Sequence, residues 1–448
     1  MKFFLACSAA LFGLLLSPTT AQKYAFAHMV VGNTAAHTQD TWAQDITLAR
    51  NTGLDAFVLN IAYPDPNIYG QGEPSPITTL AGWLAHADLG SPAGSVFKLF
   101  FAFDYLGGGQ TWPATGDRSV VSYLNQYKNS PAYFRYNGVP LVSTFEGRDN
   151  TNDWAQGGVI RSAVGGIWFV PDWTSFGPTG FAQHLNKVEG AFNWDMWPIG
   201  ASDINTDLDN QWRSVLGSKS YMMGISPWFF HSADSPKKWV WRGDDSWALR
   251  WTQAIDFGAP FIQIVTWNDW GESSYVGPLR STTEIPAGSG IYVDGQSHES
   301  WLDFLPYYIA KYKGSAFTVS RDQMQYWYRT APATAGSTCG VVGGDSSQDN
   351  GVPEISPNSI LLDKIFFTAL LSSPAQVHVQ IGANPETVYS FGAGITHQSL
   401  AFNGQTGAPR FWVTRNGVTT GSGTGKAITA GTALPGGCTN YNPWVGSF

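Results

Sequence analysis

Short apolar runs alternate with amphipathic segments along the first two thirds of this chain, and this alternation restricts the possible folds more than any other feature. Each run is rich in β-branched and aromatic residues, which favour strands, and each is too short for a typical helix. Eight such runs occur, at residues 23–31, 54–62, 97–104, 139–146, 166–172, 188–195, 220–227 and 260–267.

The segments between the runs have the pattern of helices. Several begin with Asp or Thr and end before Gly, which are signals for the start and the end of a helix. They lie at residues 38–53, 78–90, 117–134, 180–187, 206–219, 244–258 and 300–314, and the weakest connection is 147–165. Strand and helix alternating eight times predict an α/β fold, a (β/α)8 TIM barrel over residues 22–329.

The first 21 residues have the pattern of a secretory signal peptide. Lys2 is followed by an apolar core and then by small residues that end at Ala21. We therefore expect residues 1–21 to be removed, and Cys7 with them. The mature protein is expected to be secreted, extracellular or cell-wall associated. No other stretch is long and apolar enough for a bilayer span, so we expect no membrane partner.

The chain changes character after the predicted barrel. Residues 330–358 are rich in Gly, Ser, Thr and Pro, which is typical of a linker. Residues 359–448 alternate strand-like runs with turns, which predicts a C-terminal all-β sandwich. Cys339 and Cys438 bracket this region. In an oxidising compartment a pair of cysteines favours a disulfide over a metal site, which needs four clustered ligands.

The composition indicates the class of ligand. A net charge of −8 argues against nucleic acid, because phosphates need a basic protein surface. The 20 Trp residues suit sugar binding, since flat apolar rings stack on pyranose faces. The sequence shows no His-rich or Asp-x-Asp cluster with ligand spacing and no Gly-x-Ser-x-Gly motif. We therefore expect no metal, no cofactor and no Ser-His-Asp hydrolase.

Polar residues at the ends of the predicted strands indicate where chemistry would take place, because active sites of (β/α)8 barrels lie at the carboxyl ends of the strands. The last run continues into TWNDWGES (266–273), where Asp269 and Glu272 stand three positions apart among tryptophans. Several carboxylates in one cleft raise each other's pKa, so that one can be an acid while another is a base. Further candidates for the same rim are His28, Asn60, Asp104, Glu146, Asp172, Asp195, Trp228 and His231, with Trp267 and Trp270 inside the motif.

Paired carboxylates flanked by aromatic rings fit the hydrolysis of a glycosidic bond. One carboxyl protonates the leaving oxygen, and the second attacks the sugar or activates water. Trp228, Trp267 and Trp270 are plausible platforms for sugar rings, although buried Trp is common and most of the 20 Trp residues must simply pack. Asp195 is expected as a sugar ligand, because aromatic residues flank it. Structural alternatives stay open for the others: a cap or turn for Asp104, salt bridges for Glu146 and Asp172, and core hydrogen bonds for His28 and Asn60.

Four segments carry a resemblance to a known family: YAFAHMVVGNT, DITLARNTGLDAFVLNI, KLFFAFDY and FIQIVTWNDWGESSYVGP. Over about residues 24–312 the chain resembles the fungal endo-α-1,3-glucanases, the mutanases of glycoside hydrolase family 71. The resemblance implies an inverting enzyme that cleaves the α-1,3-glucan of fungal cell walls, followed by a β-sandwich. It also implies that Asp269 and Glu272 are the catalytic pair and that Asp104 is a third essential carboxylate. One departure is Ser274, where the family pattern leads us to expect His.

We assign Glu272 as the general acid and Asp269 as the general base, with Asp104 positioning water or binding a sugar hydroxyl. Inversion requires the two working carboxyls to stand roughly 6.5–9.5 Å apart. The expected partner is a polysaccharide, and the protein is expected to be a monomer. Two alternatives stay open: a barrel glycosidase that cuts another glucan linkage, and a non-catalytic protein that binds cell-wall glucan. The C-terminal sandwich could also bind carbohydrate by itself.

Overall fold

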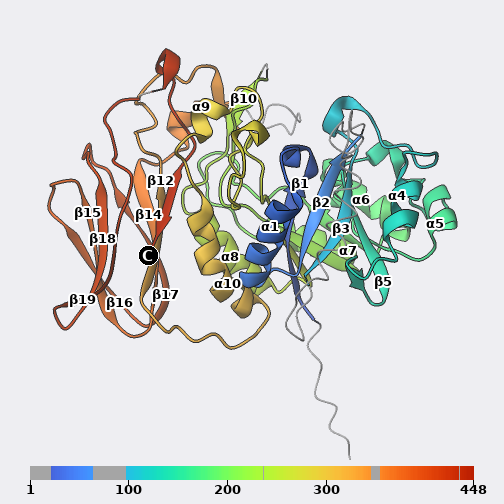
Figure 1. Cartoon of the computed structure of the whole chain (residues 1–448), viewed down its shortest axis with the longest axis horizontal. Helices are drawn as coiled ribbons and strands as arrows, with labels where there is room; N and C mark the ends of the chain where they lie inside the picture. Colours follow the sequence, from blue (N-terminus) through green and yellow to red (C-terminus); the bar gives the residue numbers. More distant parts are fainter. Residues whose placement is uncertain (1–21, 64–96, 236, 345–353, 433) are drawn as a thin grey trace, which may run out of the picture.

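The protein has two neighbouring parts, one of mixed helices and strands and one made of strands alone (Figure 1). The computed structural model describes residues 22–63, 97–235, 237–344, 354–432 and 434–448. The predicted signal peptide (1–21) and the predicted helix at 78–90 therefore lie outside the described residues. Among the described residues, no helix combines the length and the apolar character needed to cross a bilayer.

Every one of the predicted apolar runs contains a strand. The strands pair in parallel in the order β5-β3-β2-β1-β11-β8-β7, and β6 also pairs in parallel with β5. Isolated parallel bridges join Asp172 to Phe145 and to Phe192. The predicted α/β class is therefore confirmed. The strands are β1 (Tyr24–Val30), β2 (Ala56–Ala62), β3 (Lys98–Asp104), β5 (Val139–Phe145), β6 (Trp168–Phe169), β7 (Gly190–Asn193), β8 (Ser220–Ile225) and β11 (Phe261–Ile264), with a short antiparallel strand β4 (Arg135–Tyr136) beside β5.

Aromatic side chains hold these strands together. Phe26 of β1 packs edge to face against Phe100 of β3 and against Phe134, with ring centroids 5.0 Å apart in both pairs. All three rings are buried. Burying one such side chain contributes about 1.5–3 kcal/mol. Because the runs are apolar throughout, they suit strands that are covered on both faces.

Helices follow most of the strands. Helix α1 begins with a capping box, in which the Thr38 and Thr41 side chains each accept the other's backbone N–H. The chain after it turns at Gly53, whose φ of +94° favours glycine. The weak connection 147–165 contains a three-residue 3-10 helix, Arg148–Asn150, and a six-residue α-helix. The helices are α1 (Gln39–Asn51), α4 (Val120–Tyr127), α5 (Val159–Val164), α6 (Gly177–Phe181), α7 (Asp207–Leu216), α8 (Ser246–Phe257), α9 (Gly290–Val293) and α10 (Leu305–Tyr312).

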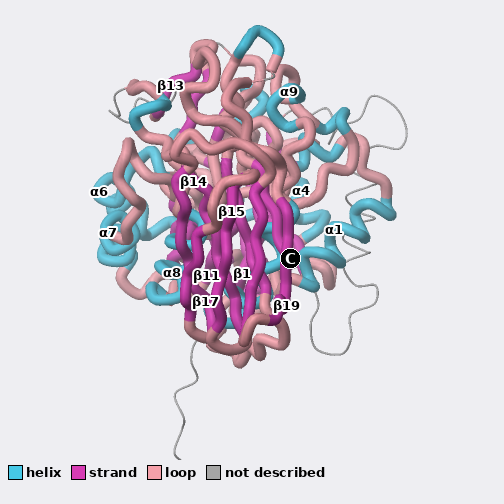
Figure 2. The backbone as a smooth tube through the Cα atoms, turned by 90° about the vertical axis from the view of Figure 1, so that its left-hand side faces the viewer, coloured by secondary structure: helices cyan, strands magenta, loops and turns pink. Residues whose placement is uncertain are grey.

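The C-terminal part consists of two four-stranded antiparallel sheets (Figure 2). The two sheets share a hydrophobic core, in which Tyr326 stacks on Phe411 with ring centroids 3.7 Å apart. Strand β12 lies before residue 359, the predicted start of this part, yet it pairs with β14 and β20. One sheet is β17 (Gly394–Ala401), β14 (Lys364–Leu371), β12 (Gln323–Tyr328) and β20 (Trp444–Ser447), and the other is β16 (Thr387–Phe391), β15 (Ala375–Ile381), β18 (Pro409–Arg415) and β19 (Val418–Thr424).

The predicted disulfide is present. Cys339 and Cys438 are bonded, with 5.6 Å between their Cα atoms and a sequence separation of 99 residues. In the chain-entropy account, closing a loop of this length stabilises the fold by roughly 4.7 kcal/mol. The same region adds a strand to the α/β part, because β13 (Val341–Gly343) pairs in parallel with β10 (Lys238–Val240).

Buried hydrogen bonds connect the two parts. Trp327 of β12 donates from Nε1 to the backbone O of Asp244 at 2.7 Å. Trp228, which follows β8, donates from Nε1 to the backbone O of Tyr441 at 2.9 Å. Each indole N–H thus finds its acceptor in the other part, which fixes how the sheets sit against the α/β part.

Candidate active site

The connection after β11 carries the predicted catalytic pair and is anchored to the end of β1. Asn268 pairs its side-chain amide with the backbone of Val30, donating to O at 2.9 Å and accepting from N at 2.8 Å. The chain then returns alongside itself, because Thr266 N donates to Ser274 O and Val276 N donates to Thr266 O, both at 3.0 Å. These bonds hold the motif as a tight loop at the end of the sheet.

Asp269 closes a turn within this loop. Its Oδ1 accepts the N–H of Glu272 at 3.0 Å, and its own N–H donates to the Thr266 hydroxyl at 2.8 Å. Burial raises the pKa of Asp269 to about 6, although the N–H groups of Glu272 and Gly271 lower it. A carboxyl with this pKa gains and loses a proton near neutral pH, as a catalytic acid or base must.

Glu272 lies on the wall of a cavity of about 700 Å³. Its backbone O accepts the N–H of Phe230 at 2.8 Å, and Gly271 O accepts the N–H of Ser232 at 2.8 Å, so the loop is also tied to the segment after β8. A cavity of this size is typical of small-molecule sites. Asp195 shares this wall, whereas Asp269 and Asp104 are not among the residues that line it.

A row of aromatic rings forms much of this cavity. Trp194 packs edge to face on Phe145 at 4.8 Å, and Trp197 packs in the same way on Phe229 at 4.8 Å between ring centroids. Trp239 continues the row from Phe229 at 5.7 Å. We call these five residues the aromatic row. Other lining residues include Ser175, Phe176, Ile199, Asp203, Asn205 and Trp241.

Two predicted carboxyl residues lie behind this cavity wall. Glu146 accepts hydrogen bonds from the N–H and the hydroxyl of Ser175, and Asp172 accepts from the N–H and the hydroxyl of Thr174. Burial raises the pKa of Asp172 well above its usual value, and the charge of Glu146 raises it further. Although these carboxyls are close, no group of three His, Cys, Asp or Glu suited to a metal ion occurs in the described part of the chain.

Parallel pairing brings Asp104, at the end of β3, beside Asn60 of β2. Asn60 Nδ2 donates to Asp104 Oδ2 at 3.2 Å. The other oxygen, Oδ1, accepts the N–H groups of Leu106 at 2.9 Å and Gly107 at 2.6 Å. Burial raises the pKa of Asp104, while these hydrogen bonds lower it. Asp104 therefore closes a turn, and Asn60 orients its second oxygen.

The two predicted histidines contact aromatic rings of the cavity. His28 is buried, with Nδ1 2.8 Å from Gln263 Nε2, and its ring meets Trp194 at 5.1 Å. Burial lowers the pKa of His28 to about 3, so its ring is neutral. His231 stacks on Trp239 with ring centroids 4.2 Å apart. Neither histidine lines the cavity. Both instead support rings that do line it, Trp194 for His28 and Trp239 for His231.

The whole described sequence matches one family. The family model with the description Glycosyl hydrolase family 71 covers residues 21–448. The chain belongs to glycosyl hydrolase family 71. It is 31% identical to the mutanase Pc12g07500 of Penicillium rubens, over 96% of this chain and 90% of that protein. It is 29% identical to the glucan endo-1,3-alpha-glucosidase agn1 of Schizosaccharomyces pombe, over 97% of each.

A third relative of this family 71 chain matches a shorter segment. The ascus wall endo-1,3-alpha-glucanase of Schizosaccharomyces pombe is 28% identical over 316 residues, which cover 67% of this chain and 69% of that protein.

Ser274, where the family pattern leads us to expect His, is fully buried in this structure. Its hydroxyl lies 3.1 Å from the Thr266 hydroxyl, inside the motif loop.

The three tryptophans predicted as sugar platforms are buried instead. Trp228, Trp267 and Trp270 are each 1% exposed, and none of them lines the cavity. Two glycines explain why these rings fit so closely. A Cβ at Gly243 would stand 2.1 Å from the Trp228 ring, and one at Gly277 would stand 2.5 Å from the Trp267 indole nitrogen. The prediction of platforms is therefore wrong for these rings, because they pack in the core.

The four tryptophans that line the cavity come from two stretches, and none of the four was predicted as a sugar platform. Trp194 and Trp197 flank Asp195 in NWDMWP, and the aromatic neighbours of Asp195 were the reason to expect it at the site. Trp239 and Trp241 alternate in the stretch KKWVWR, at and after β10. Alternate residues of an extended chain share one face, so this spacing could have identified the pair.

Proposed function

We propose that this family 71 enzyme hydrolyses α-1,3-glucosidic bonds within polymeric α-1,3-glucan. The observation that carries the proposal is the position of Glu272, on the wall of an aromatic cavity and in the same short loop as Asp269. Two relatives, a mutanase and a glucan endo-1,3-alpha-glucosidase, support the linkage by their names. Aromatic walls with a few carboxylates suit sugar rings, whose faces are apolar and whose edges carry hydroxyls.

In the proposed mechanism, Glu272 is the general acid and Asp269 is the general base. Glu272 gives its proton to the leaving glycosidic oxygen as the bond to the anomeric carbon breaks. Asp269 takes a proton from water, whose oxygen forms the new bond on the opposite face of the sugar. An α linkage then yields a β product. The backbone N–H groups of Glu272 and Gly271 favour the carboxylate form of Asp269, and its pKa of about 6 suits a base at mildly acidic to neutral pH.

Asp104 is proposed to position the attacking water or to bind a sugar hydroxyl. Its Oδ1 is occupied by two backbone N–H groups, and Asn60 donates to Oδ2. These bonds hold the Asp104 carboxyl in one orientation at the end of β3, beside the end of β2. A fixed acceptor of this kind orients a hydroxyl or a water at low entropic cost.

The aromatic row and Asp195 are proposed to bind the glucan chain. Asp195 is exposed between Trp194 and Trp197, so its carboxylate can accept sugar hydroxyls while a neighbouring ring stacks on the pyranose. Glu146 and Asp172 act indirectly, through Ser175 and Thr174, whose side chains belong to the cavity lining.

We also propose that the parallel strands form a complete (β/α)8 barrel. The strand order runs from β5 through β1 to β7, and the bridges from Asp172 to Phe145 and Phe192 support closure between β6 and β7. The proposed units are a catalytic barrel at 22–329, a join at 330–358 and an accessory sandwich at 359–448. Strand β12 pairs within the sandwich sheets, which favours moving the boundary to a point before Gln323.

Export remains part of the proposal. The disulfide between Cys339 and Cys438 suits an oxidising compartment, which supports secretion or a place in the cell wall. The proposed working form is a monomer, because the aromatic cavity and the motif loop are both built from one chain. Light scattering of the purified protein tests this form.

The test of the proposed function is turnover on insoluble glucans. The purified protein is incubated with α-1,3-, β-1,3- and α-1,4-glucans, and soluble products are separated by chromatography. We expect oligosaccharides from α-1,3-glucan alone. Cleavage of another glucan would assign a different linkage. Binding without products, retained in Asp269→Asn and Glu272→Gln, would identify a non-catalytic wall-binding protein.

A further inference from the structure

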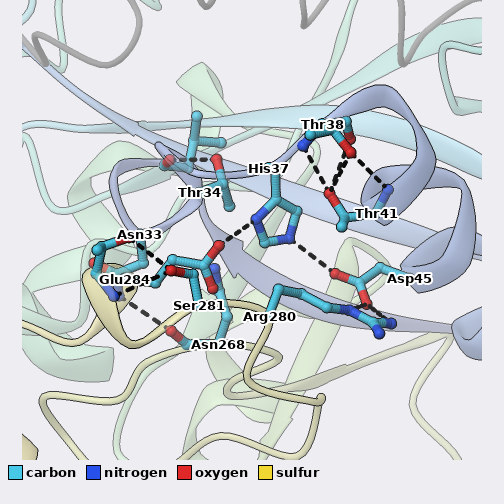
Figure 3. A network of polar contacts seen from close by, with 12 residues as sticks. Asn33, Thr34, His37, Thr38, Thr41, Asp45, Asn268, Arg280, Ser281 and Glu284 are labelled. Atoms are coloured by element: carbon cyan, nitrogen blue, oxygen red, sulfur yellow. Dashed lines mark hydrogen bonds and ion pairs between the residues drawn. The ribbon is translucent and has the colours of Figure 1, made fainter.

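We propose that His37 is a positioning residue that fixes the loop carrying Asp269 and Glu272. Its ring is held between Asp45 of α1 and Glu284 of the connection after β11. The inference rests on the proposed function of that loop and adds a residue that lies outside the cavity. We call His37, Asp45, Arg280 and Glu284 the His37 clamp (Figure 3).

The His37 clamp is a closed set of short contacts. His37 Nδ1 lies 2.7 Å from Glu284 Oε1, and Nε2 lies 3.0 Å from Asp45 Oδ2. Arg280 donates from Nε at 2.9 Å and from Nη2 at 2.6 Å to Asp45 Oδ1. The side chains of His37, Asp45 and Glu284 are at most 2% exposed. Contacts between buried charges are screened little by water, so each is strong.

The geometry requires a charged imidazole. A neutral histidine has one N–H and one acceptor nitrogen, whereas the protonated ring donates from both nitrogens. Here both nitrogens face carboxylates, so only the protonated ring matches both partners. With His37 and Arg280 positive and Asp45 and Glu284 negative, the clamp is neutral overall, which is how buried charges are tolerated.

The His37 clamp holds the catalytic loop from its far side. Arg280 and Glu284 follow Glu272 in the same connection. Residues 273–278, which lie between Glu272 and Arg280, are buried. At the near side, Asn33 donates from Nδ2 to the backbone O of Asn268 at 3.1 Å. The segment after β1 therefore grips the connection before Asp269 and again after Glu272. A displacement at Arg280 reaches the loop through the buried residues 273–278, which begin directly after Glu272.

The protonation of His37 makes this support dependent on pH. Burial alone lowers the pKa of His37, but hydrogen bonds and charges from Asp45 and Glu284 raise it above its usual value. The charged groups that face the ring are Asp45 and Glu284, with Arg280 beyond Asp45, and the Trp42 ring covers it at 4.8 Å. The clamp is complete below about pH 6.5 and weakens as pH rises through the raised pKa.

The test compares three variants of the full chain on α-1,3-glucan. In His37→Gln, the side-chain amide can donate to one of the two carboxylates, but its oxygen then faces the other and repels it. We expect kcat to fall roughly tenfold or more relative to the parent protein, while KM stays within about twofold. His37→Gln/Glu284→Gln restores a donor for that oxygen, so most of the lost kcat should return. The matched control is His378→Gln on β15. The His378 ring also uses both nitrogens, Nδ1 for Glu386 and Nε2 for Thr414, but it lies in the sandwich. This variant should therefore keep the kcat of the parent protein.

Two further measurements make the outcome independent of turnover. Amide hydrogen exchange of residues 266–284 should rise in His37→Gln and return towards the parent level in the double variant. The parent protein should have a higher midpoint of thermal unfolding than His37→Gln. This difference should shrink as pH rises through the raised pKa of His37. Unchanged exchange, or a folded His37→Gln with parental kcat, would overturn the positioning role. A parent protein that is inactive on α-1,3-glucan would instead overturn the proposed function, since exchange still decides the role of His37.

Discussion

The connections after β11 and after β7 both reach the cavity, and they are built in opposite ways. Residues 266–278 after β11 are almost all buried, and their backbone groups bond to β1, to β9 (Phe230–His231) and to each other. Residues 194–205 after β7 are largely exposed, and Ile199 is 66% exposed. The first connection carries the acids and the second carries Trp194, Asp195 and Trp197.

This difference matches the two tasks of a glycosidase. Proton transfer depends on placing a carboxyl within a fraction of an ångström, so the acids lie on a segment that cannot move freely. Holding a polymer needs contact area more than precision, and exposed rings supply it. The two connections should therefore respond to mutation in different kinetic constants.

The largest effect is expected at the β11 connection. Glu272→Gln or Asp269→Asn removes one proton carrier and keeps the shape, so kcat should fall by about 10²–10⁴-fold with little change in KM. Initial rates on α-1,3-glucan measure both constants. Comparable losses of kcat in Asp195→Asn, which changes a proposed sugar ligand, would remove the contrast between the two connections.

The pH dependence of the same pair gives the next largest effect. Asp269 must be ionised to act as the base, and its pKa is about 6. Activity should therefore decline roughly tenfold for each pH unit below 6, and it should fall again at higher pH once Glu272 loses the proton that it must donate. A profile of kcat against pH tests this expectation. Trp197→Ala should show the same acid limb, because the ring makes no contribution to the proton balance.

Substitution in the β7 connection should weaken binding instead. Trp197→Ala removes a ring from the aromatic row, and we expect KM for α-1,3-glucan to rise by up to about tenfold while kcat stays within a few-fold. Trp412→Ala, at a half-buried ring on the outer sandwich sheet, is the matched control and should leave both constants unchanged. A fall in kcat alone for Trp197→Ala would show that this connection is as rigidly coupled to the chemistry as the other.

The elements of this fold were predictable where local chemistry decides them. Thr38 and Gly53 indicated the ends of α1, and apolar runs indicated the strands. Partners distant in sequence were not predictable. Strand β12 joins the sandwich only because β14 and β20 lie on either side of it.

The acids of the site were easier to predict than its aromatic rings. Asp104 is the last residue of β3, and Asp269 and Glu272 lie in the connection after β11, where a charged residue stands out from the apolar run before it. A tryptophan ring, by contrast, is found both in the protein core and on the wall of a binding site, and its position in the sequence does not distinguish the two. Trp228 and Trp267 are buried because Gly243 and Gly277 leave room for their rings, and such close approach depends on the tertiary fold.

The last prediction concerns stability and not activity. The pKa of Asp269 lies above its usual value of 3.8 because burial disfavours the charge, so the native state loses stability as pH rises from about 3.8 to about 6 and does not regain it at higher pH. Asp269→Asn keeps an acceptor for the Glu272 N–H without the charge, and should gain up to about 3 kcal/mol at pH 7. The gain should vanish below about pH 4. Urea unfolding at both pH values measures it, and a loss at pH 7 would show that the carboxylate is stabilised by its loop.

The most direct test of the whole account is the stereochemistry of cleavage. Proton NMR during the first minutes of hydrolysis of α-1,3-glucan resolves the anomeric form of the new reducing ends before they equilibrate in water. If Glu272 protonates the leaving oxygen while Asp269 activates water on the opposite face, the β anomer forms first. First formation of the α anomer would show that a carboxylate attacks the sugar directly, and would contradict the assignment of Asp269 as a base.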